Sequence, residues 1–72
     1  MYGSAALHER QTNAIRALQL LKSEFLEMPG LKLTAPQASR LIALDIDKTE
    51  PLLDALVDAG FLRRTPTGFV RA

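Results

Sequence analysis

Apolar residues recur at helical spacing through the first third of the chain. Between residues 9 and 28 they form one stripe at 100° per residue, and charged residues fill most of the remaining surface. Leu20 lies on a flank of this stripe, where an exposed side chain is expected. Pro29 ends the segment because proline has no amide hydrogen and disfavours a helical residue before it. The stripe consists of Ala14, Leu18, Leu21, Phe25 and Met28, with Ala17 at its edge.

The first eight residues are too few to show a convincing period. We therefore predict a flexible arm over residues 1–8 and a helix from Glu9 onward. Leu7 projects onto the same apolar stripe, so a start one turn earlier stays open.

A short alternating segment and a second helix follow. Leu31–Leu33 is long enough for one β-bridge but too short for a sheet of its own. Thr34 can cap a helix, with Gln37 reaching back to complete a capping box, and Pro36 is tolerated in the first turn. This helix is short and carries Ala38, Leu41 and Ile42 as its apolar positions.

A third helix extends to Ala59, where Gly60 is well placed as its left-handed terminator. Its start is ambiguous because Asp45 and Asp47 can both act as caps. Pro51 favours the later start, since proline costs about 3 kcal/mol in a helix interior. Its apolar positions are Leu52, Leu53, Leu56 and Val57.

The chain closes with a hairpin around a Thr-Pro-Thr-Gly turn. Proline at the second turn position and glycine at the fourth suit a type I turn. We predict an α+β fold of three helices and a three-stranded sheet formed near Leu31–Leu33, Leu62–Thr65 and Gly68–Arg71. The predicted core is Leu18, Leu21, Phe25, Leu31, Leu33, Ala38, Leu41, Ile42, Leu53, Leu56, Val57, Phe61, Leu62 and Phe69.

Composition narrows the classes of function. The chain has 72 residues, no cysteine and one histidine. It allows one small domain, over residues 9–72, and excludes disulfides, thiolate nucleophiles and cysteine-containing zinc sites. No serine has an evident base partner and no glycine-rich phosphate loop occurs, so we expect no enzymatic activity, no cofactor and no metal. No apolar run approaches the ~20 residues of a membrane span, and a cytoplasmic location is expected.

Two segments resemble the winged helix-turn-helix family. They are LTAPQASRLIALD, residues 33–45, and LLDALVDAGFLRRTPTGFVRA, residues 52–72. The family resemblance implies a winged helix-turn-helix fold and a DNA-binding module, commonly of a transcription regulator. It also implies that the third helix enters the major groove and that the hairpin, the wing, touches the DNA backbone.

The resemblance also assigns candidate DNA contacts. Positions facing the groove would be Asp47, Lys48, Glu50, Pro51 and Asp54, and wing positions Arg63, Arg64, Thr65, Thr67 and Arg71. The second helix would offer Gln37 and Arg40 to phosphates. The set that we expect to bind DNA is Lys48, Thr49, Arg63, Arg64, Thr67, Arg71, Arg40 and Gln37. Thr49 has a second interpretation as a buried residue, because the family usually places an apolar residue there.

The charge distribution raises an alternative. Residues 45–59 carry one lysine against five acids, a net −4, whereas residues 60–72 carry three arginines and no acid. Acids at the helix start favour its dipole, but Asp54 and Asp58 lie beyond it and would face phosphates. The alternative function is therefore a protein-interaction module whose acidic third helix binds a basic partner without DNA. Leu20 with Ala17 could also mark a homodimer contact on the first helix, although a lone exposed leucine needs no explanation.

Overall fold

The computed structural model describes the backbone of residues 2–72 and the side chains of residues 14–72. Three helices precede a two-stranded antiparallel hairpin, and together they form a small α+β domain with a winged-helix layout. The helices are α1 (Tyr2–Glu27), α2 (Ala35–Ile42) and α3 (Ile46–Asp58). The strands are β1 (Leu62–Thr65) and β2 (Gly68–Arg71).

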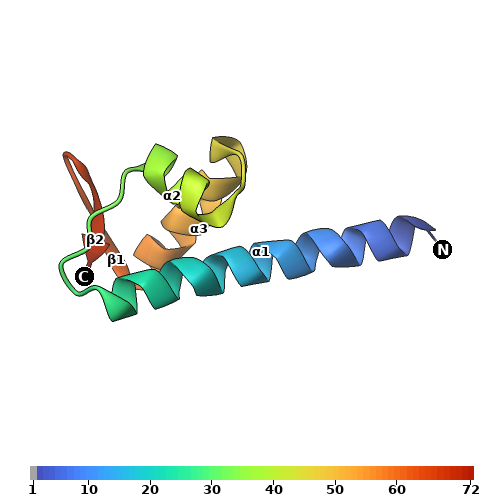
Figure 1. Cartoon of the computed structure of the whole chain (residues 1–72), viewed down its shortest axis with the longest axis horizontal. Helices are drawn as coiled ribbons and strands as arrows, with labels where there is room; N and C mark the ends of the chain where they lie inside the picture. The colour runs from blue at the N-terminus through green and yellow to red at the C-terminus, as the bar shows by residue number, and fades with distance from the viewer. Residues whose placement is uncertain (1) are drawn as a thin grey trace.

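Helix α1 is the longest element and supports the others. It has 26 residues, which corresponds to about 39 Å of helix, and the domain measures 44 × 20 × 19 Å. The C-terminal half of α1 lies under α2 and α3, the hairpin stands at its C-terminal end, and its N-terminal half extends away from all of them (Figure 1). Because α1 begins at Tyr2, the predicted start at Glu9 is wrong, and so is the flexible arm predicted over residues 1–8, since the backbone of residues 2–8 continues the helix.

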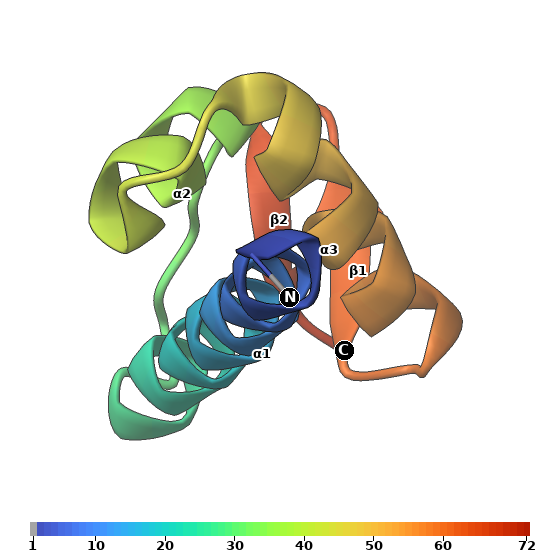
Figure 2. The ribbon, with the colours of Figure 1, turned by 90° about the vertical axis from the view of Figure 1, so that its right-hand side faces the viewer.

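Helix α2 begins at the predicted capping box. The Gln37 amide donates to the Thr34 hydroxyl, and the Gln37 side chain accepts from the Thr34 amide at 2.9 Å. A left-handed residue, Ala43 with φ 54°, turns the chain from α2 into α3. Seen along α1, the two helices stand side by side with the hairpin behind them (Figure 2).

Helix α3 begins earlier than Pro51 suggests. Its first residue is Ile46, with Asp45 as the cap residue, and Pro51 lies inside the helix. The proline removes one backbone hydrogen bond. The early start is favoured because it buries Thr49 completely and lets the Thr49 hydroxyl donate to the Asp45 carbonyl at 2.9 Å. The end agrees with prediction, since Gly60 has φ 78°.

The hairpin and its bridge match the predicted sheet closely. β1 and β2 pair with Leu62 opposite Arg71 and Thr65 opposite Gly68. The third strand is reduced to one bridge, in which Leu33 and Phe69 exchange hydrogen bonds of 3.1 and 2.7 Å. This bridge fixes the hairpin to the segment before α2.

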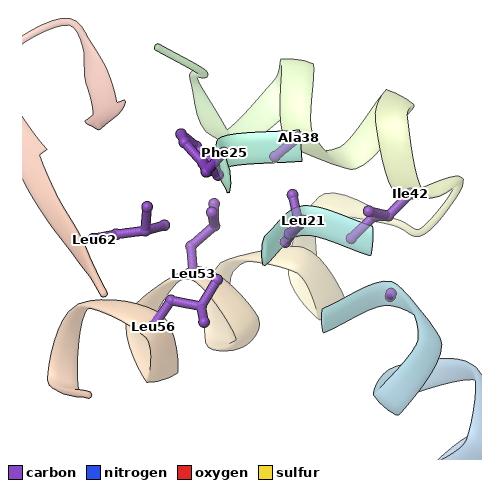
Figure 3. Packing of buried hydrophobic residues seen from close by; sticks show 8 residues of the cluster. Leu21, Phe25, Ala38, Ile42, Leu53, Leu56 and Leu62 are labelled. Carbon is purple, nitrogen blue, oxygen red and sulfur yellow. The ribbon is translucent and has the colours of Figure 1, made fainter. Parts of the chain in front are cut away.

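The core lies where α1, α2, α3 and β1 meet (Figure 3). Most predicted core residues are buried or packed against the core, but Leu41 is 36% exposed and does not belong to it. Ala17, expected only at the edge of the apolar stripe, is buried. The buried apolar set is Ala17, Leu21, Phe25, Ala38, Ile42, Leu53, Leu56 and Leu62.

Candidate nucleic-acid interface

The arginines of the hairpin divide between the two faces of the sheet. Leu62 is 2% exposed and points into the core, and side chains alternate along a strand, so Arg64 shares its face and Arg63 points outward. Arg71 lies opposite Leu62 and also faces inward. The three arginines therefore do not form one patch.

The inward arginines are engaged with the protein itself. Arg64 forms an ion pair with Asp54 of α3, and its guanidinium carbon lies 5.2 Å from the centre of the Phe69 ring. The guanidinium of Arg71 lies 4.2 Å from the centre of the Phe61 ring at the base of the hairpin. The ion pair joins the hairpin to α3, whereas the two cation–π contacts lie within the hairpin and at its base. Exposed cation–π contacts are worth about 0.5–1 kcal/mol each.

Arg63 has a cationic neighbour on the outer face that sequence reasoning missed. Lys32 precedes the bridge residue Leu33, so alternation places it on the outer face, next to Val70, which pairs with Arg63. The Lys32 ammonium donates to the Thr67 hydroxyl at 2.9 Å. Lys32 and Arg63 therefore flank β2 on the face turned away from α3; we call this pair the outer basic face.

The exposed side of α3 is acidic along its length. Thr49, Leu53 and Leu56 are its buried positions, and the opposite stripe is formed by Asp47, Pro51, Asp54 and Asp58, all exposed. We call this stripe the acidic face. Within the part of the chain whose side chains are described, Arg64–Asp54 is the one ion pair, so Asp47 and Asp58 have no cation against them.

The other predicted DNA contacts differ in exposure and in hydrogen bonding. Thr49 is 0% exposed and its hydroxyl donates to the Asp45 carbonyl and lies near the Leu44 carbonyl. Its prediction as a DNA contact is therefore wrong, and its second interpretation as a buried residue is confirmed. Gln37 is exposed, but its side-chain oxygen is used in the capping box. Arg40 and Lys48 are exposed, as is Thr67 at the hairpin turn.

An open hollow of about 320 Å³ separates the hairpin from the start of α2. It is lined by Thr34, Ala35, Arg64, Thr65, Pro66, Thr67, Gly68 and Phe69. Among the described residues, no group of three His, Asp or Glu is arranged to hold a metal ion. Within the same residues, no helix combines the length and apolarity that crossing a bilayer requires.

Comparisons of the chain with models of protein families, with curated proteins and with solved structures found no match. The candidate interface therefore rests on the geometry of the chain itself.

Proposed function

We propose that the protein binds duplex DNA through phosphate contacts and acts as a transcription regulator in the cytoplasm. The observation that carries the proposal is the outer basic face. Lys32 and Arg63 are exposed on the side of the sheet turned away from α3, where the acids of α3 reduce their attraction for phosphates least. Arg40 and Lys48 add two further exposed cations.

The acidic face argues against deep insertion of α3 into the major groove. A groove-facing helix approaches phosphates on both sides, and Asp47 and Asp58 would meet them without compensation. Asp54 is partly neutralised by Arg64. We therefore propose that phosphate contacts by Arg63 of the wing and by Lys32 dominate, so that binding has little sequence preference.

Salt dependence tests this mechanism. If Lys32, Arg63, Arg40 and Lys48 each contact one phosphate, the affinity for DNA should fall about a hundredfold between 50 and 200 mM salt. The double variant Lys32→Ala, Arg63→Ala should bind random duplex DNA more weakly and lose only about tenfold over the same range. Fluorescence anisotropy with a labelled random duplex measures both effects.

The matched control is the double variant Lys22→Ala, Arg71→Ala, because Arg71 packs on the Phe61 ring and its removal frees no acidic side chain. It removes one lysine and one arginine, as the test variant does, but from α1 and from the inner face of the sheet. Its affinity should stay within about threefold of the unaltered protein at each salt concentration. Equal losses in the two double variants, or binding that does not respond to salt, would refute the proposed contacts.

A protein-interaction module is the second candidate, and the acidic face favours it. In this function a basic partner binds Asp47 and Asp58, and DNA does not bind. The variant Asp47→Lys, Asp58→Lys leaves the Arg64–Asp54 pair in place and reverses the charge of the stripe. For the DNA-binding protein it should strengthen duplex binding by about tenfold or more at low salt.

Chemical-shift titrations separate the two candidates. Random duplex DNA should shift the amides of Lys32 and Arg63 if the first function holds. An oligolysine peptide should shift Asp47 and Asp58, with no response to DNA, if the second holds. The charge-reversed variant should then no longer bind the peptide.

A further inference from the structure

The side of α1 that borders α2 carries an apolar residue between opposite charges. Leu20 is 40% exposed, and Arg16 and Glu24 lie one helical turn before and after it. Beside Leu20, α1 and the end of α2 form an open groove of about 280 Å³. It is lined by Arg16, Ala17, Leu20, Ile42, Ala43 and Leu44.

We propose that this face binds a second copy of the chain, with the two α1 helices antiparallel and a two-fold axis at Leu20. Arg16 and Glu24 are equally spaced from Leu20, so each Arg16 then lies opposite the partner's Glu24. The same ion pair forms twice, which is the condition for a self-complementary surface. The groove beside Leu20 accepts the partner's Leu20.

Charge favours a second copy over an unrelated occupant. Over residues 14–27 the basic Arg16 and Lys22 balance Glu24 and Glu27, so two copies of the helix do not repel each other. Within the described side chains, neither Arg16 nor Glu24 has an ion-pair partner in the monomer. Both charges are therefore available to pair across the axis.

The interface is small, so we expect a weak, concentration-dependent dimer. Analytical ultracentrifugation without DNA should show a monomer of 7.9 kDa converting to a species of twice that mass as concentration rises. Leu20→Glu should raise the dimer dissociation constant at least about tenfold. Ile15→Glu is the matched control, because Ile15 is 57% exposed on another face of α1, and it should leave the constant unchanged.

A charge exchange tests the register. Arg16→Glu or Glu24→Arg alone places like charges opposite each other at both pairs, and each variant should be monomeric. An equimolar mixture of the two restores both opposite-charge pairs and should form a heterodimer. Circular dichroism checks that each variant folds.

Three outcomes would overturn the proposal: a monomer at all concentrations, dimerisation that Leu20→Glu leaves intact, and a mixture that stays monomeric. None of these experiments contains DNA, so their failure is distinguishable from failure of the proposed function. A dimer would carry two outer basic faces, and each would raise the affinity of the other if both contact the same duplex.

Discussion

Phe25→Ala is expected to lower the free energy of unfolding by about 3–5 kcal/mol. Phe25 is 1% exposed and lies among core residues of α2, α3 and β1 (Figure 3). Truncating it leaves a cavity where these elements meet. A domain of this size has only about 4–11 kcal/mol of stability in total, so the variant loses a large part of it.

Urea unfolding followed by circular dichroism measures this loss. The control is Leu26→Ala, the next residue of α1, which is 59% exposed and should change stability by no more than about 0.5 kcal/mol. If both variants unfold at the same urea concentration as the unaltered protein, the core assignment is wrong.

Gly68→Ala is the second large effect, an expected loss of about 2–3 kcal/mol. Gly68 has φ 149°, a conformation that residues with a side chain rarely adopt, and an added Cβ would lie 2.7 Å from the Leu33 carbonyl oxygen. That oxygen accepts the Phe69 amide in the bridge. The methyl group therefore strains the turn and pushes apart the bridge that holds the hairpin.

The loss should be visible both in urea unfolding and in the amide resonances of Leu33 and Phe69, which report the bridge. Gly30→Ala is the control, because an added Cβ there meets nothing within 4 Å. It should be neutral or slightly stabilising, since alanine restricts the unfolded chain more than glycine does. A Gly68→Ala protein with unchanged stability and an intact bridge would contradict this account.

Local chemistry made much of the fold predictable. The capping box at Thr34 and Gln37, the terminating Gly60 and the hairpin turn all depend on residues within four positions of each other, and the structure confirms each of them. Helical periodicity likewise identified Leu21 and Phe25 as core residues. The start of α1 was predicted too late because residues 2–8 are too few to show a convincing period, although Leu7 lies on the same apolar stripe.

Tertiary packing decided what local rules could not. Pro51 argued for a late start of α3, but burial of Thr49 and its hydrogen bond to Asp45 favour the early one. Thr49 was for the same reason misassigned as a DNA contact. Local patterning gives no signal that this hydroxyl residue is buried. The signal came from the family resemblance, which usually places an apolar residue at this position and so offered burial as the second interpretation.

The candidate site depended on register more than on composition. Arg63 and Arg64 are neighbours in sequence, yet the strand places them on opposite faces, and the buried position of Leu62 already implies which one points inward. The same alternation, starting from the inward-facing Leu33, places Lys32 on the outer face beside Arg63. The ion pair between Arg64 and Asp54 joins separate elements and could not be predicted from spacing.

The wing is held at several points before any ligand arrives. Arg64 forms an ion pair with α3, and Phe69 forms the β-bridge with Leu33 in the loop before α2. The Thr67 hydroxyl accepts a hydrogen bond from the Lys32 ammonium. An ammonium has three donors, so Lys32 can keep this bond while it contacts a phosphate. Because the wing is already ordered, binding there loses little conformational entropy, and the affinity is higher than it would be for a flexible loop that makes the same contacts.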